Sequence, residues 1–390
     1  MSLAPGNQQA QPLPGLPAPH HRHSSMMHMP QIPGRTLTSL PLTCLLLLVT
    51  LSMTALMTFG SAFASEQREL QLLIWSEYLD PTVVAEFEAS CNCRLRQIFY
   101  ETDEDRDQMV QETEGDGFDV ALLNDVMIAP YAKRGWLAPI DRSRIPNIKN
   151  VDPRWLSAFP DADTYAVPYF WGTLGIAYDS VKVTWPVDSW MDLFRPDEAL
   201  RQKIIMLNDA RDTIGMALLA LGYSLNESDP KALAAAARLL EQQRPFVRTY
   251  SYVGLSAESG IVTGDFLMAM IYNGDAITLQ KIDPSIRYVV PKEGSNLWAD
   301  YLVVLKKSRN KDLALQFINF VNDPQIAARL ARFSNYATPN KAAEKYLPEA
   351  FINNPAIYPP AAVLERSQTY QPLPATAVKA RNAIFAKLTR

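Results

Sequence analysis

The sequence predicts an α/β protein of two lobes, each a mostly parallel sheet flanked by helices. Short apolar runs alternate with helical patterns along residues 65–390, the order expected of parallel strands covered by helices. This stretch holds 326 of the 390 residues, a length typical of two domains. No repeat or low-complexity linker divides it, so we expect the chain to cross between the lobes more than once.

The expected elements follow in order. Asp80 is suited to cap a helix that has Pro81 at its first position. The expected strands are Leu70–Trp75, Arg94–Tyr100, Phe118–Leu123, Gly175–Tyr178, Ile204–Leu207, Phe266–Tyr272 and Tyr301–Leu305. The expected helices are Pro81–Ser90, Glu104–Glu112, Val126–Arg134, Ile214–Leu221, Lys231–Gln243, Asp312–Val321 and Pro324–Phe333.

The first 64 residues have the layout of a secretory signal peptide behind an N-terminal extension. Residues 36–60 are apolar and uncharged, and they follow Arg35. The small-residue site Ser61-Ala62-Phe63-Ala64 comes next, so we expect cleavage near Ala64 and an exported, periplasmic product. The alternative is a transmembrane anchor, because the run is long enough to span a bilayer.

Removal of this segment restricts the chemistry that remains. All four histidines precede residue 29, so the mature chain has none. This excludes Ser-His-Asp and Cys-His catalysis and any histidine-ligated metal. Without Arg22 and Arg35, 35 basic residues stand against 41 acidic ones, a net charge near −6. A mildly acidic protein of this kind is a poor nucleic-acid binder, and nothing in the sequence calls for a cofactor.

Two cysteines remain, Cys91 and Cys93. An oxidising compartment allows them to pair, although residues two apart in a strand lie at the limit of disulfide reach. The alternative is a pair of small core residues.

Carboxylates and aromatic residues gather where predicted strands end. Ligands of open parallel sheets bind beyond the carboxyl ends of the strands. The first strand ends in Trp75-Ser76-Glu77-Tyr78 and the third in Asn124-Asp125. Three further motifs supply Asp209 and Asp212, then Tyr272 and Asp275, then Trp298 and Asp300.

These residue types suit an organic cation. A buried ammonium needs a counter-charge, and an aromatic face adds about 0.5–2 kcal/mol of cation–π attraction. Each motif also has a purely structural interpretation. Trp75 is consistent with an ordinary loop, Asp209 or Asp212 with a helix cap, the segment 272–275 with a turn, and Tyr336 with core packing. Asp300 precedes a strand, where aspartate is disfavoured, so it needs partners.

At this point the chain resembles a known family, the periplasmic polyamine-binding proteins of ABC importers, which are receptors for spermidine and putrescine. The resemblance runs from about Leu70 to the C-terminus. Its landmarks are WSEY at 75–78, PYFWGT at 168–173, DSWMDLF at 188–194, NDAR at 208–211, YNGD at 272–275, PKEGSNLWAD at 291–300, YATPN at 336–340 and NPAIYPP at 354–360.

The resemblance implies a type II periplasmic binding protein fold that closes on its ligand by a hinge. It places the first lobe at 65–173 plus 299–344 and the second at 174–298 plus 345–390. The residues that it implies in the ligand cleft are Trp75, Ser76, Glu77, Tyr78, Asn124, Asp209, Asp212, Tyr272, Asp275, Trp298, Asp300, Tyr336 and Gln368.

The chain departs from the family pattern after the third strand. The family has a serine with a nearby aromatic residue there, whereas this chain has Asn124-Asp125-Val126. Asn124 can still accept a hydrogen bond, and Asp125 adds an acid. Five or six candidate carboxylates favour spermidine, with three charges, over putrescine, with two.

The resulting hypothesis is a monomeric receptor that captures a polyamine without chemistry and delivers it to permease subunits in the membrane. Negative potential attracts the cation and hinge closure retains it. One alternative is an enzyme, because paired carboxylates can hydrolyse glycosides. Others are a sensory module that reports to a membrane receptor, and a receptor for another cation such as a quaternary ammonium.

Overall fold

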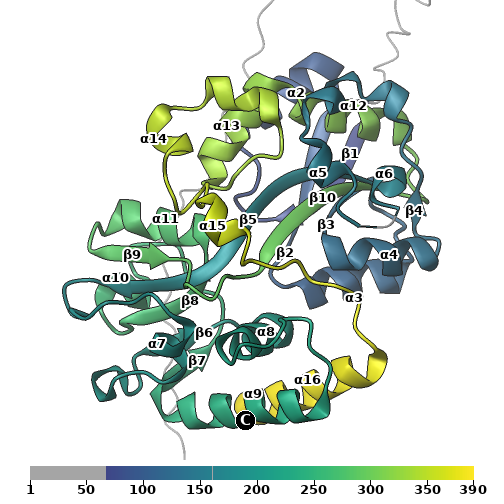
Figure 1. Cartoon of the computed structure of the whole chain (residues 1–390). Coiled ribbons are helices and arrows are strands. Elements are labelled where there is room, and N and C mark those ends of the chain that lie inside the picture. The colour runs from purple at the N-terminus through teal and green to yellow at the C-terminus, as the bar shows by residue number, and fades with distance from the viewer. Residues whose placement is uncertain (1–66, 160) are drawn as a thin grey trace, which may run out of the picture. The chain divides into compact units, whose positions relative to one another are not determined.

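The computed structural model describes residues 67–159 and 161–390, which belong to one compact unit, Ser65–Arg390. The predicted signal peptide and its cleavage site lie outside the described residues. The unit is an α/β structure built on a ten-stranded mixed sheet (Figure 1). The strands follow the order β2-β1-β3-β10-β5-β8-β6-β7, with β4 paired to β10 and β9 paired to β5.

Two parallel groups form the two ends of this order. The strands β2 (Arg94–Tyr100), β1 (Glu69–Trp75) and β3 (Val120–Asn124) form the first group. The strands β7 (Val247–Tyr250), β6 (Ile204–Met206) and β8 (Met268–Tyr272) form the second group. We refer to the parts of the chain packed around these groups as the first lobe and the second lobe.

Two long strands join the groups and make the sheet mixed. β10 (Leu297–Leu305) runs antiparallel to β3 and to β5 (Ala166–Asp179), and β5 runs antiparallel to β8. The short strands β4 (Leu137–Ala138) and β9 (Ile286–Val289) add further antiparallel pairs. The sheet therefore has more antiparallel pairing than the sequence suggested, because the crossing strands contribute to both lobes.

Helices cover the sheet and connect its strands (Figure 1). Their bounds are α2 Pro81–Cys91, α3 Asp103–Thr113, α4 Asp125–Lys133, α5 Pro153–Leu156, α6 Ala162–Tyr165, α7 Trp190–Phe194, α8 Ala210–Ala220, α9 Pro230–Gln243, α10 Gly260–Thr263, α11 Asn273–Ile282, α12 Lys311–Val321, α13 Pro324–Ser334, α14 Glu349–Ile352, α15 Ala361–Leu364 and α16 Ala375–Leu388. No helix of the described part is long and apolar enough to cross a membrane.

The predicted start of α2 is confirmed. The Asp80 side chain accepts a hydrogen bond from Thr82 N at 2.8 Å, and Pro81 occupies the first helical turn. The same Asp-Pro pair begins α5, α9 and α13. An aspartate cap satisfies a free amide, and proline there costs no hydrogen bond, so this dipeptide fixes where each helix starts.

Two local expectations were wrong. Tyr272-Asn273-Gly274-Asp275 is not a turn: Tyr272 ends β8 and Asn273 begins α11. The Asn273 side chain accepts from Thr173 N and donates to Ala356 O, which ties this helix start to neighbouring backbone. Asp300 lies within β10 rather than before it, because pairing with β5 extends the strand back to Leu297.

The buried residues of the two lobes form separate clusters. Along β5, Phe170 and Trp171 pack with the first lobe, whereas Leu174 and Ile176 pack with the second. This change falls beside the expected boundary at 173/174. Leu347 and Ile357 also pack with the first lobe, although they belong to the segment that we assigned to the second; Tyr370 and Leu388 do pack with the second. The exact lobe boundaries remain a prediction.

Cys91 and Cys93 form a disulfide, with 5.2 Å between their Cα atoms. This separation lies within the usual range for bridged cysteines. The sequence alone left this pairing open. Cys93 is also buried in the first-lobe core, so both interpretations hold for that residue.

We expect Phe87→Ala to destabilise the protein by about 3–5 kcal/mol, because it removes a fully buried ring. Phe87 lies 5.2 Å from Phe317 and 5.4 Å from Phe320, between ring centroids, and so holds α2 against α12. Urea unfolding would measure the loss. Val181→Ala is the control, because that side chain is 71% exposed and should shift the free energy of unfolding by less than about 0.5 kcal/mol.

Candidate ligand-binding cleft

A cavity of about 340 Å³ opens where strands of both lobes end. Its wall includes residues at or just after the carboxyl ends of β1, β2, β3, β6, β7 and β8. The first lobe contributes through β1, β2 and β3, and the second through β6, β7 and β8. The carboxyl ends of the strands in both parallel groups therefore lie at one cavity, as expected for ligand sites of parallel sheets.

The structure brings eleven of the thirteen predicted site residues to this wall. They are Trp75, Ser76, Glu77, Tyr78, Asn124, Asp212, Tyr272, Asp275, Trp298, Asp300 and Tyr336.

Asp209 and Gln368 do not line the cavity. Asp209 caps α8, and its Oδ1 accepts from Asp212 N at 2.7 Å. The Gln368 backbone donates to Ser295 O and accepts from Leu297 N. Its side-chain oxygen accepts from Ser224 Oγ and Leu225 N. Both side chains therefore use their oxygen atoms in structural hydrogen bonds within the protein.

Sequence reasoning missed other wall residues. They are Glu101, Asp103, Arg211, Tyr252, Val253, Leu255, Asn296 and Tyr370. Glu101 and Asp103 follow β2, so the strand-end rule that selected Glu77 would have found them. Tyr252 follows β7, a strand that we did not predict. Asp125, noted only as a nearby acid, also lines the cavity.

Aromatic rings form the apolar part of the wall. The Trp298 ring lies 5.0 Å from Tyr336 and 5.8 Å from Tyr272, centroid to centroid, with both partners nearly perpendicular to it. Tyr78 lies 5.6 Å from Tyr336. On another part of the wall Trp75 lies 6.0 Å from Tyr252. The two contacts of Trp298 are edge-to-face and the other two are tilted, and together they orient the rings of the wall.

Glycines leave room for three aromatic residues of the wall. A Cβ added at Gly172 would stand 2.6 Å from Trp298 Cζ2, and one at Gly274 would stand 2.6 Å from Tyr336 Cζ. A Cβ at Gly215 would stand 2.8 Å from the Tyr370 hydroxyl. Each glycine is therefore required for the close approach of a wall residue.

Two tyrosine hydroxyls hold the Asp212 carboxylate. Tyr272 donates to Oδ2 at 2.6 Å and Tyr370 to Oδ1 at 2.7 Å. Burial, together with the charge of Asp209, raises the pKa of Asp212 to about 6. Removal from water disfavours the charged form of a carboxyl group, which explains the direction.

Asp275 and Asp300 occupy two further positions. Tyr336 donates its hydroxyl to Asp275 Oδ1 at 2.7 Å, and desolvation raises the pKa of Asp275 to about 6. Burial raises the pKa of Asp300 well above its usual range, and the charges of Asp103 and Asp125 add to this effect. Desolvation likewise raises the pKa of Asp125 to about 7.

Arg211 joins the two lobes across the cleft. It comes from α8, and its Nη2 lies 3.3 Å from Asp103 Oδ2 of α3. Asp103 also pairs with Arg106 at 2.6 Å and accepts from Asn124 Nδ2. The Arg211 guanidinium stacks over the Tyr370 ring at 5.0 Å. Asp103 is thus neutralised by two arginines.

The other central acids have no such partner. Within the described residues, Asp212, Asp275 and Asp300 form no ion pair with lysine or arginine. Four polar atoms of the wall are buried and lack a hydrogen-bond partner in the described residues: Asn124 Oδ1, Asn296 Oδ1, Trp298 Nε1 and Arg211 Nε. Buried polar groups are normally paired, so the two amide oxygens can accept hydrogen bonds from a bound molecule and the two N–H groups can donate to one.

No group of three or more possible metal ligands occurs in the described part of the chain.

Comparison with known proteins identifies the family of this chain. The family model described as "Bacterial extracellular solute-binding protein" matches residues 82–359. The chain belongs to this family. Its description is of binding proteins, not enzymes, which confirms the expectation of binding without catalysis.

Individual relatives agree with this assignment. The spermidine/putrescine-binding periplasmic protein of Escherichia coli is 30% identical over 79% of this chain and 88% of that protein. The norspermidine sensor of Vibrio cholerae is 29% identical over 82% and 89%. The crystal structure of the spermidine/putrescine ABC transporter substrate-binding protein PotD from Streptococcus pneumoniae matches 83% of this chain and 98% of its own, with 28% identity and a TM-score of 0.73.

We expect Asp275→Asn to stabilise the ligand-free protein at pH 7.5. The folded-state pKa of Asp275 lies above the unfolded value, so ionisation between about pH 4 and 7 weakens the folded state. Since each pKa unit corresponds to about 1.4 kcal/mol and the pKa rises from 3.8 to about 6, the gain should be on the order of 3 kcal/mol. It should fall to about 1 kcal/mol at pH 4.5, where the carboxyl group is protonated in the folded state but still largely ionised in the unfolded state, and it should vanish below about pH 3.

Denaturant unfolding of both proteins at the two pH values measures this difference. Glu365→Gln removes an exposed carboxylate and serves as the control. Equal stabilisation by Asp275→Asn at pH 4.5 and 7.5 would contradict the desolvation argument.

Proposed function

We propose that this protein captures a polyamine outside the cytoplasm and delivers it to the permease of an ABC importer, with spermidine preferred over putrescine. The observation that carries the proposal is the set of three acids, Asp212, Asp275 and Asp300, that face one aromatic-walled cavity without a basic partner in the described residues. Carboxylates withdrawn from water are stable only with a counter-charge, and the ligand would supply it.

The wall suits the stem of a polyamine as well as its charges. Faces of Trp298, Tyr336 and Tyr78 can cover methylene groups, at about 0.8 kcal/mol for each buried CH₂. The same faces add cation–π attraction to the amine ends. A cavity of about 340 Å³ falls within the size range of small-molecule sites.

The preference for spermidine rests on the number of separate positions at which the cavity presents a carboxylate. Asp212 is held by Tyr272 and Tyr370, Asp275 by Tyr336, and Asp300 lies in β10 near Asp125. Three positions match three amines better than two. The name of the Escherichia coli relative includes both ligands, so it supports the ligand class without favouring either amine.

Delivery would follow from closure around the ligand. The cleft draws its acids from both lobes, and Arg211 and Asp103 already meet across it. A ligand that contacts both lobes favours the closed arrangement, which a permease can distinguish from the open one. We propose that the protein acts as an exported, periplasmic monomer, consistent with the periplasmic proteins among its relatives.

A sensory role is the second candidate. The Vibrio cholerae relative is named a norspermidine sensor and covers 82% of this chain. The cleft would be the same in both roles, and only the membrane partner would differ. Capture of the protein by its permease, or by a membrane receptor, in the presence of polyamine would separate the two.

We expect spermidine to bind the ligand-free protein at least about tenfold more tightly than putrescine or cadaverine, because its third amine can meet another acid. Asp300→Ala should weaken binding by about 10²–10³-fold, since loss of a buried charge partner costs about 2–5 kcal/mol. Isothermal titration calorimetry of protein refolded from denaturant, to remove bound amines, measures both effects.

The exposed acid Glu365 provides a matched control, because Glu365→Ala should leave the affinity unchanged. Circular dichroism confirms that each variant is folded. No heat from any polyamine with folded, ligand-free protein would rule out the proposal, and tighter binding of putrescine would overturn the stated preference alone.

Gly274→Ala should weaken spermidine binding by about tenfold or more. The new methyl group would push against the Tyr336 ring, which donates to Asp275. Alanine favours a helix more than glycine does, so a loss of affinity would not come from a weaker α11. Gly254→Ala is the control, because a Cβ there meets nothing within 4 Å. Unchanged affinity in Gly274→Ala would show that Tyr336 can move without cost.

A further inference from the structure

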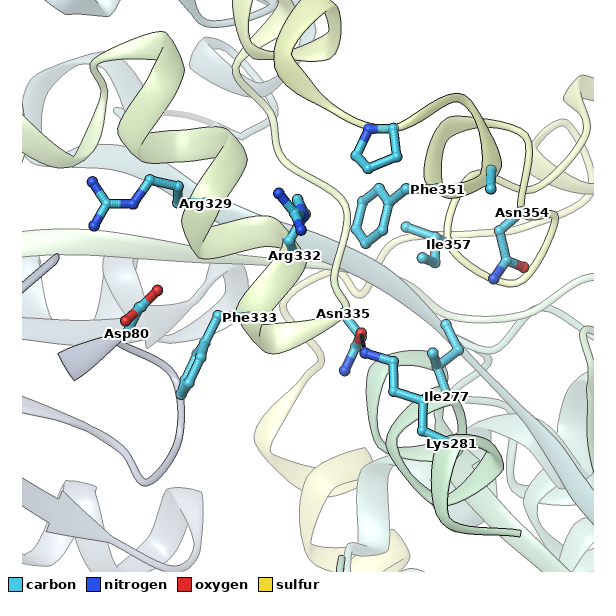
Figure 2. A pocket seen from close by; sticks show the side chains of 12 residues that line it. Asp80, Ile277, Lys281, Arg329, Arg332, Phe333, Asn335, Phe351, Asn354 and Ile357 are labelled. Carbon is cyan, nitrogen blue, oxygen red and sulfur yellow. Dashed lines mark hydrogen bonds between the residues drawn. The ribbon is translucent and has the colours of Figure 1, made fainter. Parts of the chain in front are cut away.

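A second cavity, of about 560 Å³, lies outside the cleft and shares none of its wall residues. We call it the basic pocket. Figure 2 shows its principal side chains: Lys281 from α11, Arg329, Arg332 and Phe333 from α13, and Phe351 from α14. Its walls thus combine helices that follow strands of both lobes.

Positive charge in the basic pocket is not balanced. Both Arg332 and Lys281 are exposed. The Arg332 side chain makes no hydrogen bond or ion pair with the described residues, and Lys281 Nζ donates only to Asn335 Oδ1, at 2.6 Å. Arg329 differs, because it is paired with Glu86 at 2.5 Å. Desolvation, and then the positive charge of Arg332, lowers the pKa of Lys281.

Apolar surface accompanies these cations. The Phe333 ring is 39% exposed, although most rings of this size are covered in the core. Phe351 packs against the first-lobe core, and the buried side chains of Ile277 and Ile357 form the floor of the pocket. Figure 2 shows Phe351 and Arg332 beside the same opening that Lys281 enters from α11. The pocket therefore offers flat apolar walls next to two cations.

We propose that the basic pocket binds a small organic anion, a carboxylate carried on a flat apolar body. The guanidinium of Arg332 presents the fork of donors that fits a carboxylate, and the Lys281 ammonium adds a second charge. The phenyl groups of Phe333 and Phe351 would cover the apolar body. The volume is that of a small-molecule site.

The chemistry of this ligand is opposite to that of the cleft. The cleft wall has several acids around one arginine that is already paired, whereas the basic pocket has three basic residues and a single acid, Asp80. A polyamine would be repelled from the basic pocket, and a carboxylate would be repelled from the cleft. The two sites can therefore be tested independently, and failure of one does not decide the other.

The test uses benzoate as the probe, titrated into the purified protein and followed by calorimetry. We expect saturable binding that weakens at least about tenfold in Arg332→Gln and in Lys281→Gln. Benzyl alcohol, which has the same ring without the charge, should not bind measurably. Lys379→Gln removes an exposed lysine far along the sequence on α16 and should leave benzoate binding unchanged.

Three results would overturn the proposal: no saturable benzoate binding, equal benzoate affinity in the two pocket variants and the native protein, or equal affinity for benzyl alcohol and benzoate. Arg332→Lys guards against misfolding, because it keeps the charge and removes only the guanidinium fork. It should bind benzoate with an affinity between those of the native protein and Arg332→Gln. Circular dichroism melting of each variant confirms a folded state.

Discussion

Negative charge held away from water is the constraint on which this structure depends. Burial disfavours the ionised forms of Asp212, Asp275 and Asp300, and no basic side chain of the described residues pairs with them. Tyrosine hydroxyls ease the penalty at two of these acids without cancelling the charge. A protein that maintains such a site sacrifices folding free energy to remain ready for a cation. Three features keep these acids in position: the aromatic wall, the ends of the strands, and Asp103 with the two arginines that neutralise it.

The pairing of β5 with β10 gives this arrangement its geometry. β5 runs from the first lobe into the second, and the chain returns to the first lobe as β10; their shared ladder extends from Leu297↔Thr173 to Val303↔Ala166. The register shifts between Asp300 and Tyr301, so an irregularity in the ladder lies at one of the central acids. A pair of continuous strands resists independent rotation of the lobes, and movement between them must be taken up as bending or twisting of this ribbon.

Much of the cleft could be predicted from the sequence, because it follows from strand ends. Trp75, Asn124 and Tyr272 each finish a parallel strand, and the chain order of apolar runs is enough to locate them. Asp209 illustrates the limit of this reasoning. An acid one turn before Asp212 looks equivalent in the sequence, but only three-dimensional structure shows that one caps the helix while the other faces the cavity.

Long-range packing accounts for most of what the sequence did not reveal. Tyr370 reaches Asp212 from a segment 158 residues away, and no local pattern marks it. The short strand β7 was hidden for a similar reason, since Val247–Tyr250 is stabilised by pairing with β6 rather than by its own alternation. The Asn335–Tyr336 segment likewise acquires its role from α11. Asn335 bonds to Thr278 and Lys281 on the side of the basic pocket, and Tyr336 bonds to Asp275 in the cleft.

The glycines behind the aromatic wall have a consequence for how such a receptor can diverge. Trp298, Tyr336 and Tyr370 stand where Gly172, Gly274 and Gly215 leave space, so the outline of the cavity is set by positions that never touch its contents. A methyl group added at Gly172 would press on Trp298, which holds none of the acids, and so would reshape the cavity while every acid stayed unchanged. Evolution can therefore change the length of ligand that fits through substitutions at these glycines, and the charge of ligand that binds through substitutions at the carboxylates.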